Sequence, residues 1–455
     1  MYEDVYGMYM TKSLPQKAWV VSVNMGYGHD RAAYSLRHLA HQGILHADIY
    51  SDIPSDDREV WERSREFYEF ISRFSKVPII GKAAFDFYDK LQSIPPFYPR
   101  RDLTDPNFPL KHIFRTIEKG WGKHLIRKLS KNPLPLISTF FIPAFMAEEF
   151  DYPEEIYCVI CDADFSRSWV PLKPAKSRIR YLAPTFRVAE RLKLYGVSED
   201  RIFVTGFPLP KENLGGETLG TLRRDLGARL LNLDPKGRYF KDHAQTVREQ
   251  VDGHRMPVKP THPLTLTFAV GGAGAQRELG RTVVQSLVEV IRTKQLHLNL
   301  IAGTRKDVAD FFLEVAREND LEKALGKNLE ILFARTKEAY FTRFNRLLRV
   351  TDILWTKPSE LSFFAALGLP IIMAPPIGSQ EKFNRTWLRS VGAGISQEDP
   401  RYANEWLFDW LNSGWFAEAA MEGFLEAPRL GTYNIEKIVA HKPEEMQEIE
   451  NVLQY

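Results

Sequence analysis

A glycine turn followed by a histidine lies near the start of the chain, in the segment 24-NMGYGHD-30. An apolar run at 18–23 reads as a strand that enters this turn, and helical spacing begins again at 31–39. His29 is therefore expected at the N-terminus of a helix, at the carboxyl edge of a sheet, where open α/β sheets bind ligands. The alternative is that the two glycines only make a tight turn and that His29 caps the helix.

A second strand runs into a glycine cluster in 268-FAVGGAGAQRELG-280. Gly271, Gly272 and Gly274 leave backbone N–H groups unobstructed, and the dipole of the following helix favours a negative charge by roughly 0.3–1 kcal/mol. Both features predict a site for a diphosphate. Because no Walker-type lysine follows the glycines, the motif argues against a nucleoside triphosphatase.

A third segment, 355-WTKPSELSFFAALGLPIIMAPPIGSQEKFNRTW-387, has polar groups at two helix starts. A polar loop opens a short helix that ends at Gly368, an apolar strand follows, and Ser379, Gln380 and Glu381 open another helix. This arrangement places carboxylate and amide groups where a ribose or another sugar can be hydrogen-bonded. The alternative for Ser379 and Glu381 is ordinary helix capping, which contributes about 1 kcal/mol.

The two cysteines of the chain, Cys158 and Cys161, lie in the alternating segment 156-IYCVICDADF-165, which reads as a buried strand. A redox-active CxxC instead requires a turn that opens a helix, so these cysteines are expected to be structural. Without a second pair of cysteines, a zinc site of the four-thiolate type is excluded.

The 455 residues carry a formal net charge of +3, so no overall field argues for a nucleic-acid partner. Basic residues are instead concentrated in 111-KHIFRTIEKGWGKHLIRKLSK-131, which predicts either a basic amphipathic helix or a solvated helix face. Residues 1–17 lack the pattern of a signal peptide, and no apolar run approaches the roughly 18 residues that span a bilayer. We therefore expect a cytoplasmic protein, at most lying on the inner face of a membrane.

Strand-like and helix-like segments alternate along most of the chain, with strands expected at 298–301, 329–333 and 370–374, which is typical of βαβ units. A stretch richer in Gly, Pro and charge separates the two halves. We therefore predict an α/β fold class with two Rossmann-like lobes that face a central cleft. The predicted divisions are an N-terminal lobe at 1–209, a linker with an insertion at 210–263, a C-terminal lobe at 264–432 and a helical tail at 433–455.

Further motifs accompany the glycine turns in a fixed order along the chain. They are Gly26, Gly28, His29, Ala32 and Ala33 in the first turn, Asp162 with Trp169 seven residues later, and VTGFP at Val204–Pro208. In this order the motifs resemble the two-lobed GT-B glycosyltransferases. The most similar branch holds monogalactosyldiacylglycerol synthase, the processive diacylglycerol glucosyltransferases and the peptidoglycan N-acetylglucosaminyltransferase, and the resemblance covers most of residues 18–209 and 265–395.

This resemblance implies an inverting transfer of a hexose from a nucleotide-diphosphate sugar, with a UDP-sugar favoured, to an acceptor on the N-terminal lobe. By the same resemblance His29 is the general base or orients the acceptor hydroxyl, a role that changes rates roughly 10²–10⁴-fold. The implied catalytic residues are His29 and Asp162, and the implied acceptor-binding residues are Gly26, Gly28 and Trp169. The implied donor-binding residues are Gly271, Gly272, Gly274, Lys357, Ser359, Glu360, Gln380, Glu381 and Asn384.

The nucleotide sugar is a co-substrate, so no cofactor is implied, and no metal is required because helix-terminal N–H groups can carry the charge of the leaving diphosphate. The branch also implies a lipid or lipid-linked acceptor such as diacylglycerol, a role in glycolipid biosynthesis and a peripheral membrane contact. Residues 61–101 correspond to the acceptor and membrane region of the lipid-modifying members, and Phe67, Phe70, Ile71 and Phe74 share one helix face there. Ordinary core packing is the alternative for these side chains.

The chain departs from that branch at the nucleotide side and after Asp162. Paired glycines usually follow Lys-Pro in the branch, whereas Ser359 and Glu360 follow here. The ribose-binding glutamate of the branch corresponds to Phe363, and Glu360, one helical turn earlier on a similar face, is the candidate to replace it. The diacylglycerol enzymes have a histidine four residues after the aspartate, where this chain has Ser166.

Two other functions remain open on the sequence. A nucleotide-sugar 2-epimerase has the same two-lobed fold and needs carboxylates around the sugar, for which Asp162, Asp164 and Glu381 are the candidates. A non-catalytic binding protein of the GT-B type would explain the missing ribose carboxylate at Phe363.

Overall fold

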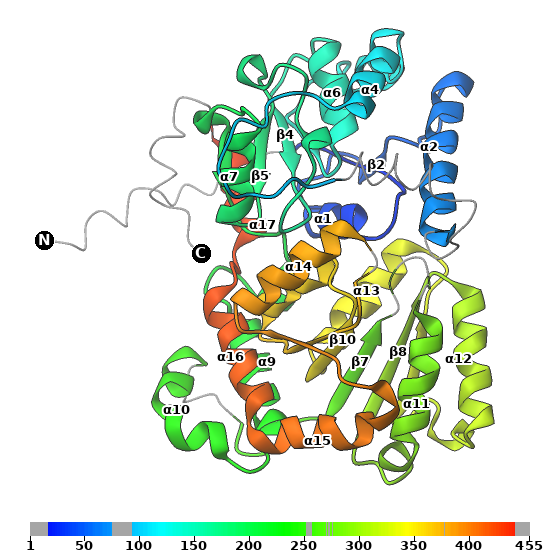
Figure 1. Cartoon of the computed structure of the whole chain (residues 1–455), viewed down its shortest axis with the longest axis vertical. Coiled ribbons are helices and arrows are strands. Elements are labelled where there is room, and N and C mark those ends of the chain that lie inside the picture. Colours follow the sequence, from blue (N-terminus) through cyan, green and yellow to red (C-terminus); the bar gives the residue numbers. More distant parts are fainter. Residues whose placement is uncertain are drawn as a thin grey trace, which may run out of the picture.

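Two sheets, each of six parallel strands, form two lobes that follow one another along the chain (Figure 1). The computed structural model describes residues 17–74, 93–251, 257–269, 271, 274, 276–376 and 378–441. The strand order is β2-β1-β3-β4-β5-β6 in the N-terminal lobe and β12-β11-β10-β7-β8-β9 in the C-terminal lobe. The predicted α/β fold class with two Rossmann-like lobes of the GT-B type is thereby confirmed.

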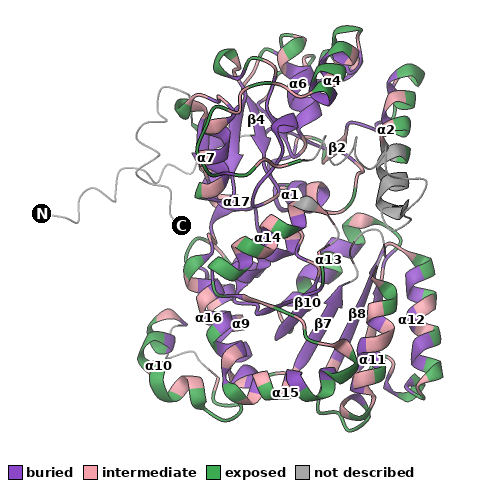
Figure 2. Cartoon of the chain, viewed as in Figure 1, coloured by how far each residue is buried: buried purple, intermediate pink, exposed green. Residues whose placement is uncertain are grey.

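Most of the N-terminal sheet is buried, as parallel strands with helical crossovers require (Figure 2). Cys158 of β4 lies opposite Ser138 of β3, and both Cys158 and Cys161 are buried free thiols, in agreement with a structural role. The strands are β1 (Trp19–Ser22), β2 (Leu45–His46), β3 (Leu136–Ser138), β4 (Ile156–Val159), β5 (Arg180–Ala183) and β6 (Ile202–Val204). The helices are α1 (Gly28–Ser35), α2 (Ser55–Phe74), α4 (Phe108–Glu118), α5 (Lys123–Leu129), α6 (Phe141–Glu149) and α7 (Phe186–Leu194).

The C-terminal sheet contains the strands predicted at 298–301, 329–333 and 370–374. Its central strand β10 pairs with β7 and β11, so that Trp355 lies beside both Phe268 and Ile372. The strands are β7 (Thr265–Ala269), β8 (His297–Gly303), β9 (Leu329–Phe333), β10 (Ile353–Thr356), β11 (Ile371–Met373) and β12 (Gly394–Ser396). The helices are α11 (Arg277–Arg292), α12 (Lys306–Glu318), α13 (Lys337–Leu348), the 3-10 helix η5 (Glu360–Leu367), α14 (Ser379–Ser390), α15 (Ala403–Ser413) and α16 (Trp415–Glu426).

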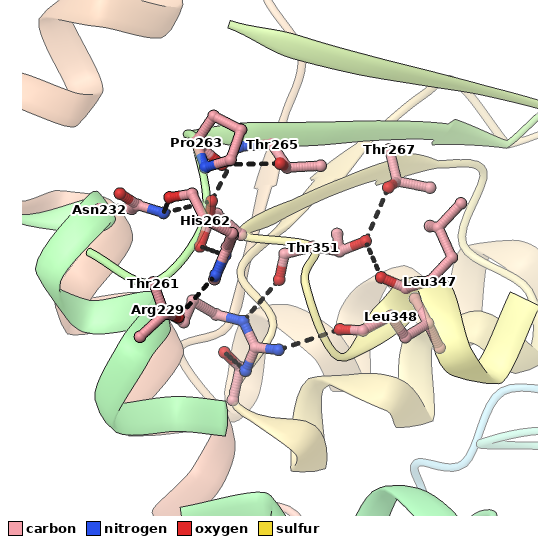
Figure 3. Close-up of polar contacts among 12 residues, drawn as sticks. Arg229, Asn232, Thr261, His262, Pro263, Thr265, Thr267, Leu347, Leu348 and Thr351 are labelled. Carbon is pink, nitrogen blue, oxygen red and sulfur yellow. Dashed lines mark hydrogen bonds and ion pairs between the residues drawn. The ribbon is translucent and has the colours of Figure 1, made fainter. Parts of the chain in front are cut away.

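In the region predicted as linker and insertion, the described residues form three helices, which are α8 (Lys211–Leu214), α9 (Gly220–Leu233) and α10 (Arg238–Gln250). Arg229 of α9 is buried and attaches this region to the C-terminal lobe (Figure 3). Its guanidinium donates hydrogen bonds of 2.7–3.2 Å to the carbonyl groups of Leu348, Thr351, Leu367 and Gly368. Because the last carbonyls of a helix lack partners within it, Arg229 caps the ends of α13 and η5 together.

A second set of contacts joins the same region to the start of β10. The carboxylate of Asp352 accepts hydrogen bonds from Asn232 Nδ2 at 3.0 Å and from the N–H of Thr265 at 2.8 Å, and it lies 3.0 Å from His262 Nε2. These residues lie at the amino-terminal edge of the sheet, opposite the edge at which parallel sheets bind ligands. We therefore assign this cluster to the stability of the fold.

The last described helix, α17 (Gly431–Ala440), returns to the N-terminal lobe (Figure 1). Asn434 Nδ2 donates a hydrogen bond to the carbonyl of Thr205 at 2.9 Å. Glu436 Oε1 lies 3.2 Å from Nε2 of His38, which also belongs to the N-terminal lobe. Within the described residues, the chain therefore crosses from one lobe to the other twice, once after β6 and once before α17.

The order of strands changes direction once in each sheet, between β1 and β3 in the first and between β7 and β10 in the second. Ligands of open α/β sheets bind beyond the carboxyl ends of the strands at such switch points. The predicted glycine turn follows β1, and the predicted glycine cluster follows β7. Both sequence motifs thus lie where this architecture binds ligands.

Candidate active site

His29 lies in the first turn of α1, directly after the glycine turn. Gly26 has a φ of +80°, a left-handed conformation that favours glycine. The His29 ring packs against Phe140 and Trp169, with ring centroids at 4.9 and 5.7 Å. Trp169 is itself only 8% exposed and packs on Phe141 at 5.1 Å. The structure therefore brings together two predicted site residues, His29 and Trp169, in aromatic surroundings.

Burial determines the charge of His29. It lowers the pKa of the imidazole, and this effect outweighs the Asp30 carboxylate and the backbone of Thr139, which raise it. The imidazole is consequently neutral at pH 7, and a neutral imidazole can accept a proton. Among the described residues, the Nδ1 atom of His29 is buried without a hydrogen-bond partner.

Asp162 follows β4 and contacts the C-terminal lobe. Its carboxylate accepts a hydrogen bond from Asn384 Nδ2 at 2.9 Å, and Asn384 Oδ1 accepts one from the N–H of Ala163 at 2.8 Å. Burial raises the pKa of Asp162 to about 6; the bond from Asn384 opposes this shift, and the carboxylates of Glu360 and Glu381 add to it. Asn384 is fully buried, and both ends of its amide bind the N-terminal lobe.

Lys357, Gly271 and Glu381 lie together on the side of the C-terminal lobe. The ammonium group of Lys357 forms an ion pair with the carboxylate of Glu381. The Lys357 side chain passes over Gly271, where a Cβ atom would lie 2.8 Å from Lys357 Cε. Since Gly271 also has a φ of +77°, both its conformation and this close approach require glycine. Predicted donor residues from the loops after β7 and β10 and from α14 thus meet at one place.

The remaining predicted donor residues lie around this group. Gly274 has a φ of +65° and precedes α11. Ser359 precedes η5 and donates its N–H to the carbonyl of Lys357 at 2.8 Å, and Gln380 lies in the first turn of α14. Gly272 lies outside the described residues. Within the described ranges, no group of three or more His, Cys, Asp or Glu side chains is arranged to hold a metal ion.

Glu381 also takes part in capping α14. Its Oε2 atom accepts a hydrogen bond of 3.5 Å from the N–H of Gly378, three residues earlier. The capping alternative therefore holds for Glu381 together with its ion pair to Lys357. The side chain of Ser379 lies outside the described part of the chain.

Phe363, at the position of the ribose-binding glutamate of the resembling branch, is a packing residue. It is 2% exposed and stacks on Phe207 with ring centroids 4.7 Å apart and an interplanar angle of 6°. The ring centroid of Trp387 lies 4.8 Å from that of Phe363. Phe207 belongs to the VTGFP motif of the N-terminal half, so this stack joins the two lobes.

Glu360 contacts the N-terminal lobe. Its Oε1 atom lies 3.3 Å from Arg31 Nε, and a Cβ atom on Gly28 would lie 3.7 Å from both the Cβ and the Oε2 of Glu360. A residue predicted for the acceptor side, Gly28, is therefore in contact with one predicted for the donor side. The carboxyl edges of the two sheets face each other at this contact.

No local pattern singles out Asp30, which follows His29 in α1 and pairs with Lys337 of the C-terminal lobe. Its buried carboxylate accepts a hydrogen bond from Ser22 Oγ at 2.8 Å, lies 3.0 Å from His46 Nε2 and forms an ion pair with Lys337 of α13. Burial would raise the pKa of Asp30, but His46 and Lys337 lower it by more, so the carboxylate is ionised. The available signal was an acidic residue in the first turn of a helix, where the dipole favours it.

Tyr27, in the glycine turn itself, also binds the C-terminal lobe. Its hydroxyl accepts a hydrogen bond from the N–H of Thr304 at 2.9 Å and lies 2.9 Å from Thr304 Oγ1. Its ring packs on Tyr340 of α13 at 5.0 Å. No local pattern in the sequence indicates these contacts, because the partners lie about 300 residues away.

Asp164, a candidate carboxylate for the epimerase alternative, is fully buried in ion pairs. It lies 2.8 Å from Arg191 Nε and 3.2 Å from Arg187 Nε. A carboxylate that is neutralised by two guanidinium groups in the protein interior is not available to a sugar. Of the three candidates, Asp162 and Glu381 remain near the interface between the lobes.

The basic segment 111–131 forms two helices, α4 and α5, because Gly120 and Gly122 take left-handed conformations between them. Most apolar side chains of both helices are buried, for example Leu110 and Leu125, whereas Phe108 at the start of α4 is exposed. Six exposed cations recur every four positions, and they are Lys111, Arg115, Lys119, Lys123, Arg127 and Lys131; His112 and Glu118 are exposed among them. None of these six cations has a carboxylate partner in the part of the chain that the structure describes. We call these six residues the basic face.

The side chains of Phe67, Phe70, Ile71 and Phe74 lie outside the described residues. Across the described ranges, no helix has the length and apolar character needed to cross a membrane.

Known proteins provide an independent comparison. No protein-family model matches the chain. A solved structure of the UDP-GlcNAc 2-epimerase of Neisseria meningitidis, bound to UDP-GlcNAc, is similar with a TM-score of 0.46 and 12% identity, covering 92% of this chain and 98% of that one.

Two curated relatives are named as processive diacylglycerol beta-glucosyltransferases. The protein of Bacillus subtilis is 26% identical over 125 residues, which cover 27% of this chain and 29% of the relative, so the match spans less than a third of that protein. The protein of Bacillus cytotoxicus is 21% identical over 386 residues, which cover 83% of this chain and 81% of the relative. The resemblance to this branch of glycosyltransferases, drawn from the motifs, is thereby confirmed.

Proposed function

We propose that this protein transfers a hexose from a nucleotide-diphosphate sugar to an acceptor hydroxyl, with inversion at the sugar. One observation carries the proposal: the His29 turn and the Gly271–Lys357–Glu381 group lie at the switch points of two sheets whose carboxyl edges face each other. The curated relatives, which are glycosyltransferases, support the same chemistry.

His29 is the proposed general base. As the acceptor oxygen attacks the anomeric carbon, the neutral imidazole takes its proton, a step that contributes roughly 10²–10⁴-fold in rate. The adjacent Asp30 carboxylate raises the pKa of His29 and thereby favours the imidazolium that forms. The carboxylate of Asp162 is bonded to Asn384 of α14, and the charged groups that act on its pKa, Glu360, Glu381 and Lys357, all belong to the C-terminal lobe. We therefore propose that Asp162 lies beside the donor sugar.

The donor diphosphate is proposed to bind at the loop after β7. Gly271 and Gly274 take left-handed conformations there, just before α11, whose N-terminal N–H groups favour an anion. Lys357 supplies a positive charge beside Gly271. The leaving nucleotide is then stabilised by fixed donors, which act most strongly where the charge develops.

The acceptor is proposed to be a lipid or a lipid-linked molecule at an anionic membrane surface. The basic face on α4 and α5 supports this, because exposed lysines and arginines each contribute about 1 kcal/mol near an anionic leaflet. Since most apolar side chains of α4 and α5 are buried in the protein, these helices would lie flat on the head groups, with the exposed Phe108 ring as the apolar group available to the membrane. The names of the curated relatives support a diacylglycerol acceptor.

A second candidate, a non-catalytic protein that binds a nucleotide sugar or none, is favoured by one observation. Phe363 replaces the ribose carboxylate of the resembling branch and is committed to packing against Phe207. The epimerase alternative is weakened because Asp164 is held by Arg191 and Arg187.

Binding of nucleotide sugars to the purified protein tests the requirement for a donor, which a non-catalytic protein without a nucleotide-sugar site would not meet. A saturating UDP-sugar at 100 times its Kd should stabilise the protein by about 2.7 kcal/mol in thermal or chemical unfolding. Lys357→Met should abolish this stabilisation, whereas Lys382→Met, at an exposed position on α14, should retain it. Absence of stabilisation by any UDP-, GDP- or ADP-sugar would contradict the proposed function.

A further inference from the structure

Arg31 of α1 is a side chain of the N-terminal lobe that is buried in the C-terminal lobe. It is 1% exposed, although it carries a permanent charge. Its guanidinium carbon lies 4.7–5.6 Å from the centres of four aromatic rings, all in the C-terminal lobe. These rings belong to Tyr340, Phe341, Phe344 and Phe364. Figure 1 shows α1 next to α13, which supplies three of them.

The polar partners of Arg31 are few for a buried charge. Nε lies 3.3 Å from Glu360 Oε1, and Nη2 donates to the hydroxyl of Tyr340 at 3.1 Å. Nη1 has no hydrogen-bond partner among the described residues. A buried ion pair with incomplete hydrogen bonding contributes little to stability compared with apolar side chains of the same volume. Such pairs are instead suited to fixing one relative arrangement of two elements.

The arrangement that Arg31 fixes includes His29. The two residues are two positions apart in the eight-residue helix α1, so the guanidinium and the imidazole move together with this helix. Glu360, the partner of Arg31, also packs against Gly28 at the start of α1. Tyr34 adds a 2.7 Å hydrogen bond between its hydroxyl and Thr342 of α13. The distance between His29 and the loops of the C-terminal lobe therefore depends on this set of contacts.

We propose that Arg31 and Glu360 act as one unit that holds α1, and with it His29, against the C-terminal lobe. Glu360 is accordingly a positioning residue that serves Arg31 and is not a ribose ligand. The effect of Arg31 and Glu360 on the reaction rate rests on the proposed glycosyl transfer. Their attachment of α1 to the C-terminal lobe does not depend on that function.

Kinetics of Arg31→Met, Glu360→Gln and the double variant test the shared role. Methionine fills the aromatic cage without the charge, and glutamine keeps the shape of Glu360. Each single change should lower kcat at least about tenfold and change KM for the donor by less than about twofold, because His29 is displaced by a fraction of an ångström. The double variant should be no slower than the slower single variant, since the two residues form one unit. A KM increase in Glu360→Gln with additive effects would show a ribose ligand and overturn the proposal.

Hydrogen exchange of residues 28–35 tests the attachment without any turnover. Arg31→Met should speed exchange in α1 at least about tenfold, and Arg31→Lys, which retains a charge and is the fallback if methionine prevents folding, should show a smaller increase. Arg349→Met is the matched control, because Arg349 pairs at 2.7 Å with Asp225 of α9 and not with the N-terminal lobe. This control should leave hydrogen exchange in α1 unchanged.

Unchanged exchange in both Arg31 variants would overturn the proposal. If exchange responds as expected but no nucleotide sugar binds, the proposed function fails and the attachment stands.

Discussion

The amide of Asn384 donates a 2.9 Å hydrogen bond to Asp162 and accepts one of 2.8 Å from the N–H of Ala163, across the boundary between the two lobes. A single side chain of α14 thus satisfies two polar groups of the loop after β4. Together with the stack of Phe363 on Phe207, it joins α14 and η5 of the C-terminal lobe to the N-terminal lobe. The geometry of that site therefore depends on contacts between residues more than 150 positions apart.

Replacing Asn384 by leucine should destabilise the protein and loosen the loop after β4. The change leaves the buried N–H of Ala163 and the Asp162 carboxylate without their partner, which costs about 1–3 kcal/mol for each unsatisfied group. Urea denaturation measures this free energy. Asn404→Leu, at an exposed position of α15, is the control and should change it by less than about 0.5 kcal/mol. Equal stability of the two variants would contradict the assigned contact.

The pH dependence of stability should carry a contribution from Asp162. Its pKa is raised from 3.8 to about 6 on folding, so the folded state binds the proton more tightly. The resulting stabilisation is present below about pH 4 and is lost as the pH rises to about 6, a change of roughly 3 kcal/mol. Asp162→Asn keeps an acceptor for Asn384 and removes the titration. The free energy of unfolding of wild type relative to this variant should fall over that pH range, and parallel profiles would refute the assignment.

Phe363 should behave as a core residue and not as a degraded ligand. Phe363→Ala should destabilise the protein by about 3–5 kcal/mol, because it removes the ring between Phe207 and Trp387. Phe363→Glu, which restores the carboxylate of the resembling branch, should be at least as destabilising because the charge would be buried. Tyr402→Ala, at an exposed ring, is the control for loss of an aromatic side chain. A stable Phe363→Glu variant with tighter UDP binding would show that the position still serves the nucleotide.

The basic face should govern membrane binding if the acceptor lies in a bilayer. Reversing the charges of Arg115, Lys119 and Lys123 should weaken binding to vesicles with 30% anionic phospholipid by well over about tenfold, at about 1 kcal/mol per removed charge. Arg238 and Lys241 are exposed on α10, outside the basic face. Reversing the charges of these two residues should leave binding to the vesicles unchanged. Co-sedimentation at low and high salt measures both variants. Loss of binding in both sets would indicate only a dependence on net charge.

Much of the fold follows from local patterns in the sequence. The strand at 329–333 coincides with β9, and the glycine turn and glycine cluster lie where β1 and β7 end, because strand length, apolar runs and glycine positions are set locally. The first helix begins at Gly28, three residues before the predicted start, because the turn residues already have helical geometry.

The contacts between the lobes could not be predicted in the same way. Arg31 reads as a solvated residue of an amphipathic helix, yet it is buried among rings that lie more than 300 residues away in the chain. The packing role of Phe363 likewise depends on Phe207, which only the folded arrangement brings near. Local patterns therefore indicate which loops form the site, while the assignment of Glu360 requires its partner across the interface.

The proposed transfer of hexose from a nucleotide sugar depends on His29 as the base. Its most direct test is incubation of the protein with UDP-hexose and vesicles that contain diacylglycerol, with mass spectrometry of the lipid and assay of released UDP. The wild type should form glycosylated lipid, and His29→Ala should lower the rate by roughly 10²–10⁴-fold while still binding UDP. A His29→Ala protein that works at the wild-type rate, or a wild type that transfers no sugar from any nucleotide donor, would contradict the account.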